Sequence, residues 1–173
     1  MKFVAILFGL LFALPALAQP TEATLEAGMR LYKTADGGAN CEHCHYWSGR
    51  GWQHNQLYST VPAGGPSLEG SKMTREQMIE MVSCGRFNTD GFIMPMYRGE
   101  AWSKEHLCWG QTAADIKPPF AKPLWGMRML NAAEVEAVVD YIQAVYVPGM
   151  TLGWCRKYFP TSPKACDNMS LRP

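Results

Sequence analysis

Hydrophobic side chains recur at helical spacing in three segments of this chain, and long loops separate the segments. In the first segment, from about residue 24 to residue 33, Leu25, Met29 and Tyr32 are spaced by four and three positions and share one helix face. No run of useful length alternates hydrophobic and polar side chains as a half-buried strand does. The pattern predicts an all-α protein with three or more helices.

The second and third helices have clear start signals. Thr74 can cap the second, with Gln77 three residues on reaching back to it, and this helix is expected to end near Gly85. Asn131 and Glu134 repeat the arrangement at the start of the third helix. The third helix has the most regular hydrophobic stripe, formed by Val135, Val138, Val139, Ile142 and Val145.

The N-terminus has the composition of a secretory signal peptide. Lys2 precedes an apolar run from residue 3 to residue 14, and small residues at positions 16 and 18 suit a signal peptidase. The run is shorter than the roughly 20 residues that a membrane-spanning helix needs. We therefore expect residues 1–18 to be cleaved and the chain to be exported, rather than retained by an anchor, with no transmembrane segment in the mature protein.

The mature chain, residues 19–173, is formally neutral. The whole sequence has 16 Lys and Arg and 15 Asp and Glu, and cleavage would remove only Lys2 from these residues. No basic excess is available to bind phosphates, so we expect no nucleic acid partner. The length suits a single domain, which typically has about 100–200 residues.

One short motif at positions 41–45, Cys-Glu-His-Cys-His, carries recognisable chemistry. Two thiols three residues apart lie on one turn and can each form a thioether with a vinyl group of a porphyrin, which puts the next residue under the iron. We interpret Cys41 and Cys44 as the attachment points of one covalent haem c and His45 as the proximal iron ligand. A buried haem would also explain how a chain with such long loops forms a core.

Two other chemistries use the same spacing of cysteines. A thioredoxin-like dithiol needs a strand before the motif and a helix after it, whereas Gly37-Gly38 precedes this motif and Trp47-Ser48-Gly49 follows it. A zinc site needs two further ligands at suitable spacing, and the nearest are His54 and Cys84. Haem attachment is the interpretation that the motif favours.

The opposite face of the iron needs a ligand of its own or is open to small molecules. Met94 is the leading candidate because it follows the second helix and precedes Pro95, which would stiffen the loop that presents the sulfur. Methionine is a common core residue, so only its position distinguishes Met94. The alternatives that stay open are Met96, Met127, Met129, His54 and His106.

Four cysteines remain outside the motif. An even remainder in an exported protein favours disulfides, and four cysteines allow three pairings. Cys155 and Cys166 would close a short loop in a Pro-rich tail, which leaves Cys84 to pair with Cys108. Buried free thiols are the alternative.

From about residue 24 to residue 146 the sequence resembles the class I c-type cytochromes, which are small soluble periplasmic electron carriers. The resemblance rests on the attachment motif and on features in the family order, namely Gly28, Tyr32, Gly65-Pro66-Ser67-Leu68, Met94-Pro95 and Tyr141. It implies a periplasmic location and first and last helices that cross where Gly28 admits Tyr141. It also implies that the Pro66 carbonyl accepts the second ring proton of His45 and so orients that ligand.

The chain departs from the family pattern in two places. An insertion from about residue 97 to residue 130 precedes the last helix and holds Trp102, Trp109, Trp125 and Cys108. An extension from residue 147 to residue 173 holds the last two cysteines. Both additions could be structural clamps stapled by disulfides, or surfaces on which a partner protein docks.

A low-spin haem with a methionine ligand suits one-electron exchange, so the resemblance implies an electron-transfer protein rather than an enzyme. Its partners would be periplasmic donor and acceptor proteins that bind briefly to a monomer, as a neutral surface favours. Two alternatives stay open. One is a dedicated cytochrome subunit of a periplasmic dehydrogenase, and the other is a haem protein whose open distal site binds small ligands.

Overall fold

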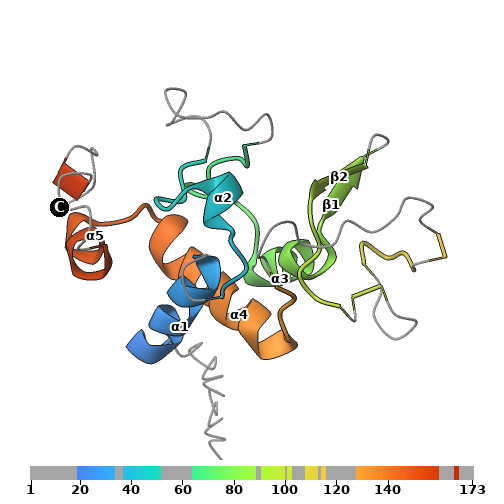
Figure 1. Cartoon of the computed structure of the whole chain (residues 1–173), viewed down its shortest axis with the longest axis horizontal. Coiled ribbons are helices and arrows are strands. Elements are labelled where there is room, and N and C mark those ends of the chain that lie inside the picture. Colours follow the sequence, from blue (N-terminus) through green and yellow to red (C-terminus); the bar gives the residue numbers. More distant parts are fainter. Residues whose placement is uncertain are drawn as a thin grey trace, which may run out of the picture.

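The structure is a computed structural model and describes residues 19–33, 37–51, 64–88, 91–99, 101–102, 108–112, 114–115, 128–159 and 166–167. Helices dominate these residues (Figure 1): α1 (Glu22–Tyr32), α2 (Glu42–His45), α3 (Arg75–Cys84), α4 (Ala132–Tyr141), the π-helix η2 (Ile142–Tyr146) and α5 (Leu152–Tyr158). Among the described residues, no helix is both long enough and apolar enough to span a membrane. The expected signal peptide lies outside them, as do His54, His106, Trp125 and Met127.

Each of the three predicted helices begins at a residue whose side chain caps it. Thr74 begins α3 and Asn131 begins α4, each as part of the predicted capping box. The helix α1 begins earlier than predicted because Thr21 is its cap. The hydroxyl of Thr21 accepts the amide of Thr24 at 3.2 Å, which satisfies one of the free amides at the helix start.

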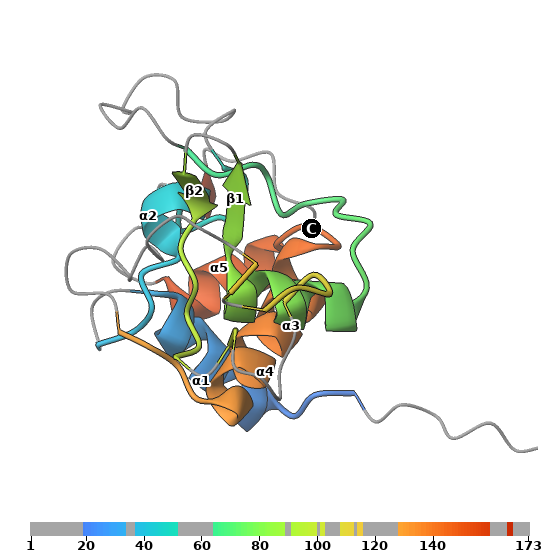
Figure 2. The ribbon, with the colours of Figure 1, turned by 90° about the vertical axis from the view of Figure 1, so that its right-hand side faces the viewer.

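Helices α1 and α4 cross at a glycine, and two views of the ribbon show them packed together (Figures 1 and 2). A Cβ atom on Gly28 would lie 2.2 Å from the carbonyl oxygen of Ala137 and 2.6 Å from Cβ of Tyr141. Only a residue without a side chain lets the two backbones approach this closely. The contact between Gly28 and Tyr141 that the resemblance implies is therefore present.

Helix α4 continues into the wider turn of η2, which changes the side chains that align. The amide of Val147 donates to the carbonyl of Ile142, five residues back, at 2.9 Å. Tyr146 thereby lies beside Tyr141, with ring centroids 4.9 Å apart, and both rings contact Tyr32 of α1. All three tyrosines are buried in the main core.

A short antiparallel hairpin follows α3, and the sequence does not predict it. Strand β1 (Arg86–Asn88) pairs with β2 (Gly91–Met94), with Arg86 opposite Met94 and an irregular register beside that pair. Strands of three and four residues are too short for alternation to reveal them. The described part of the chain is thus mostly helical, as predicted, with one small hairpin added.

Both predicted disulfides are present. Cys84, the last residue of α3, is bonded to Cys108, and Cys155 of α5 is bonded to Cys166, with Cα–Cα separations of 5.7 and 5.9 Å. All four residues are fully buried. The alternative of free thiols at these positions is therefore wrong.

Candidate functional site

The Cys-Glu-His-Cys-His motif forms a single helical turn. Cys41 precedes α2, and the amides of Cys44 and His45 both donate to its carbonyl, at 3.2 and 2.9 Å. The two predicted thioether residues therefore share one turn, with the predicted proximal ligand next to them. Neither thiol is in a disulfide, and Cys41 is buried while Cys44 is half-buried.

In the polypeptide without a bound cofactor, burial makes the thiols of Cys41 and Cys44 poor nucleophiles. It raises the pKa of Cys41 to about 12 and raises the pKa of Cys44 above its usual value. A dithiol oxidoreductase needs the opposite, a thiol pKa lowered by positive charge or by a helix N-terminus. Residues 37–41 also form no strand. The thioredoxin-like alternative therefore lacks both its electrostatics and its local structure.

The His45 ring is oriented by a backbone carbonyl from a distant part of the chain. Its Nδ1 lies 2.8 Å from the carbonyl oxygen of Pro66, so Nδ1 carries the proton and donates it. Nε2 then keeps the lone pair that can bind a metal ion. Burial lowers the pKa of His45, and the bond to Pro66 opposes this only in part, so the ring is neutral near pH 7.

Gly65 provides the surface against which this ring lies. A Cβ atom on Gly65 would be 2.7 Å from both Cε1 and Nδ1 of His45. We call residues 65–66 the strap and residues 41–45 the attachment turn. The Gly65 amide donates to the carbonyl of Cys44 at 2.8 Å, which joins the strap to the attachment turn. The Gly65-Pro66 pair therefore fixes both the plane of the imidazole and its tautomer.

Two tyrosines hold the chain where it leaves α2. The hydroxyl of Tyr32 donates to the carbonyl of Tyr46 at 2.9 Å, and that of Tyr146 donates to the carbonyl of Trp47 at 2.7 Å. Tyr141 donates in turn to the hydroxyl of Tyr146 at 2.8 Å. These bonds connect the attachment turn directly to the core between α1 and α4. Sequence reasoning identified Tyr32 and Tyr141 but missed Tyr146.

The C-terminal end of α3 is capped by residues that follow Met94 in the sequence. The carbonyl groups of residues 82–85 accept, in order, the amides of Tyr97 and Arg98 and the indole N–H groups of Trp102 and Trp109, at 3.1, 3.3, 3.1 and 3.2 Å. Carbonyl groups at a helix end have no partner inside the helix, so each needs one from elsewhere. Here two of these carbonyl groups receive their hydrogen bonds from the side chains of Trp102 and Trp109 in the predicted insertion.

The candidate methionines differ in their surroundings. Met94 packs against the main core cluster, which also contains Cys41. Met96 packs instead against a second cluster, formed by Cys84, Ala101, Trp102 and Cys108. Met129 extends toward Gly99, where its Cε would be 3.6 Å from an added Cβ. Of the three candidate sulfur ligands that the structure describes, Met94 is the one that packs against the cluster containing Cys41.

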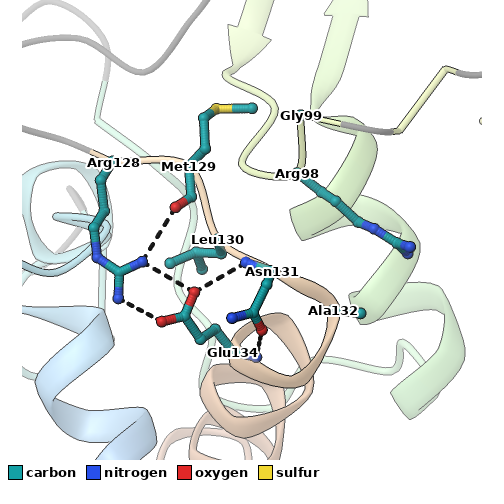
Figure 3. A pocket seen from close by; sticks show the side chains of 8 residues that line it. All are labelled: Arg98, Gly99, Arg128, Met129, Leu130, Asn131, Ala132 and Glu134. Carbon is teal, nitrogen blue, oxygen red and sulfur yellow. Dashed lines mark hydrogen bonds and ion pairs between the residues drawn. The ribbon is translucent and has the colours of Figure 1, made fainter.

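A pocket of about 470 Å³ lies at the start of α4 (Figure 3), and its lining residues are Arg98, Gly99, Arg128, Met129, Leu130, Asn131, Ala132 and Glu134. The Arg128 guanidinium binds both carboxylate oxygens of Glu134, at 2.6 and 2.9 Å, and the carbonyl of Gly37 at 2.7 Å. Arg98 extends away from this pair. Since most polar groups here bind one another, the pocket resembles a structural junction more than a ligand site.

No group of three or more His, Cys, Asp or Glu side chains within the described residues could hold a metal ion. A zinc site built from the motif and another described residue is therefore not formed. A haem iron has a different requirement because the porphyrin supplies most of its ligands. The protein needs to add only one or two.

Comparison with protein-family models, with curated proteins and with solved structures finds no match for this chain.

Proposed function

We propose that this protein is a periplasmic cytochrome c of the class I type, which carries single electrons between other redox proteins. One haem c would be attached through Cys41 and Cys44, and His45 and Met94 would bind its iron. The observation that carries the proposal is the α2 turn, which presents two unpaired thiols beside a neutral imidazole. The Nδ1 proton of that imidazole is already bound to Pro66 at 2.8 Å.

The described residues fit this cofactor, and each has a definite task. When bound, the haem supplies an iron that exchanges one electron between its ferric and ferrous states. The two thioethers would keep the group from dissociating. The Pro66 carbonyl, which accepts the Nδ1 proton, would make the His45 ring a stronger donor through Nε2. The Met94 sulfur would exclude water from the opposite face and raise the reduction potential.

The surroundings of the turn support an electron carrier because such a protein works best when little moves during the reaction. The hydroxyls of Tyr32 and Tyr146 hold the exit from α2, and Gly65 holds the ring of His45. The crossing of α1 and α4 at Gly28 is what the resemblance to class I cytochromes leads one to expect. These contacts join the proposed proximal ligand to the main core.

Two measurements test the proposal. A denaturing gel stained for haem should show colour on the parent protein, which is lost in a variant with both Cys41→Ser and Cys44→Ser. Absorbance of the ferric protein in the sulfur-to-iron charge-transfer region should disappear in Met94→Ala and persist in the matched control Met129→Ala, which removes a rival methionine that packs against neither core cluster. A band that survives in Met94→Ala would exclude Met94 as the ligand, and fast carbon monoxide binding by the parent would favour an open distal site instead.

One observation favours a second candidate, a dedicated cytochrome subunit of a periplasmic dehydrogenase. Trp109, on the insertion, is 37% exposed and is the one large hydrophobic residue at the surface among those the structure describes. Exposed tryptophans are frequent in the centres of stable interfaces. On a native gel of a periplasmic extract, a mobile carrier would migrate alone, whereas a subunit would migrate with dehydrogenase activity.

A further inference from the structure

The insertion is attached to α3 by a covalent bond and by hydrogen bonds. Cys108 is bonded to Cys84, and the amide of Trp109 donates to Oε1 of Glu80 at 2.7 Å. The indoles of Trp102 and Trp109 add the two bonds to the helix end described above. We call residues 101–102 and 108–111 the clamp. All of these contacts fall on the short stretch from residue 80 to residue 85.

The backbone of the clamp is unusual at both tryptophans. Trp102 has a φ of +69° and Trp109 a φ of +54°, in the left-handed region that bulky residues rarely adopt. Such a conformation persists only where the surrounding structure determines it. Here it occurs twice, and each time the indole N–H reaches a carbonyl at the end of α3. The strain is thus associated with one specific result, the capping of this helix end.

The stretch that the clamp binds is also the stretch that holds the Met94 segment. Gly85 has a φ of +72°, and a Cβ atom there would lie 2.6 Å from the carbonyl oxygen of Met94. The amides of Tyr97 and Arg98 donate to the carbonyl groups of residues 82 and 83, just before Gly85. Met96 packs into the cluster that contains Trp102 and Cys108. Movement of the helix end would therefore move the backbone on which Met94 is mounted.

We propose that the clamp is a positioning element, which keeps the Met94 sulfur on the haem iron by fixing the end of α3. The inference rests on the proposed function, in which Met94 is the distal ligand. Trp102, Trp109 and the Cys84–Cys108 disulfide act through the backbone of Gly85 and Met94. Loosening the clamp would leave the covalent attachment and His45 unchanged but would open the distal face to small ligands.

The second disulfide offers a matched control. Cys155 and Cys166 are as fully buried as the first pair and have a similar Cα–Cα separation, 5.9 Å against 5.7 Å. They cross-link α5 and the tail, and no described contact joins them to the Met94 segment. A general loss of stability would follow from removing either cross-link. Only removal of the first should change ligation of the iron.

The test uses the haem-loaded protein in four forms: the parent, Cys84→Ser with Cys108→Ser, Trp109→Phe, and the control Cys155→Ser with Cys166→Ser. The readouts are the sulfur-to-iron band of the ferric form, the reduction potential and the rate of carbon monoxide binding to the ferrous form. Circular dichroism at the same temperature verifies that the helices are intact. Trp109→Phe removes one hydrogen bond at a half-exposed site, so it provides a second test if the cysteine variant does not fold.

Removal of the clamp disulfide should speed carbon monoxide binding on the order of a hundredfold. Without the cross-link between Cys84 and Cys108, the chain has more conformational freedom when Met94 is off the iron, so this open state is populated more often. Trp109→Phe should speed it about fivefold, as expected for one lost hydrogen bond. The band should weaken and the potential fall in both variants, while the control should behave as the parent does.

Two negative results have different meanings. If Met94→Ala removes the band but both clamp variants keep the parent's band and binding rate, the clamp inference is wrong and the proposed function stands. If the parent has no band, or Met94→Ala keeps it, the proposed distal ligand is wrong and the clamp inference fails with it.

Discussion

The two sides of the proposed haem site are held by different kinds of contact. On the His45 side, the ring binds the Pro66 carbonyl and lies on Gly65, and two tyrosines of the core hold the exit from the turn. On the Met94 side, the backbone follows the end of α3, and that end is held by a disulfide and two indoles from the insertion. Packing and hydrogen bonds fix the position of His45, whereas a disulfide to a long loop supports the position of Met94.

This difference suggests that the two ligands respond to different changes. The contacts around His45 need only the crossing of α1 and α4 and the strap at residues 65–66. The contacts around Met94 need an oxidised disulfide as well. A perturbation of the core should therefore disturb the whole protein, while a perturbation of the insertion should affect only the Met94 side of the proposed site.

Gly28→Leu should have the largest effect because it separates the helices beneath the attachment turn. The first atom of the new side chain would lie 2.2 Å from the carbonyl oxygen of Ala137, a backbone atom that cannot rotate away. We expect a loss of about 3 kcal/mol or more in the free energy of unfolding. Urea unfolding followed by circular dichroism measures it.

A glycine in an open position provides the control for this variant. An added Cβ on Gly153, in α5, would have no neighbour within 4 Å. Gly153→Ala should therefore leave the protein as stable as the parent or raise its stability by up to about 1 kcal/mol. If Gly28→Leu were as stable as Gly153→Ala, the close crossing of α1 and α4 would be contradicted.

Tyr146→Phe tests the connection between the core and the attachment turn. The variant keeps the ring but loses the bond to the Trp47 carbonyl and leaves the Tyr141 hydroxyl without its acceptor. Since the Tyr141 hydroxyl is buried and Trp47 is half-buried, we expect a loss of about 1–3 kcal/mol in the free energy of unfolding.

The same variant sharpens the comparison when it is combined with Cys84→Ser and Cys108→Ser. If the two sides are independent, the changes in unfolding free energy should add to within about 0.5 kcal/mol. A coupling well above that value would mean that the core and the clamp stabilise each other. The sulfur-to-iron band should respond to the cysteine changes and remain in Tyr146→Phe.

Sequence reasoning was most successful where a feature depends on nearby residues. The capping boxes at Thr74 and Asn131 are local, and the structure contains both. The turn that presents Cys41, Cys44 and His45 is equally local. The disulfides could be predicted by elimination, because pairing Cys155 with Cys166 closes a short loop and leaves only Cys84 and Cys108 to form the second bond.

The features that were missed depend on distant contacts or on irregular backbone. On a regular α-helix Tyr146 would be rotated about 140° from Tyr141, so periodicity gave no reason to place them together. The π turn of η2 removes that offset. The roles of Trp102 and Trp109 depend on left-handed backbone and on a helix end many residues earlier. No spacing in the sequence indicates either.

Glu134→Gln should have the smallest effect and tests a charge contact on the His45 side. The hydrogen-bonded Arg128 guanidinium holds the pKa of Glu134 below its usual value, and Arg128 also binds the carbonyl of Gly37, shortly before the attachment motif. Because the pKa is lower in the folded state, this stabilisation is present at pH values above the usual 4.5 and is lost as the pH falls through the folded-state pKa.

The substitution separates charge from geometry because a glutamine at this position can still accept the Asn131 amide that completes the capping box. The pair lies at the surface, so the variant should lose no more than about 1 kcal/mol near pH 7 and low salt. Urea unfolding repeated at decreasing pH should show the difference from the parent shrinking, because Glu134 of the parent becomes protonated as the pH falls through its folded-state pKa. A difference that persisted at low pH would mean that the shape of the Glu134 side chain, rather than its charge, joins α4 to the attachment side.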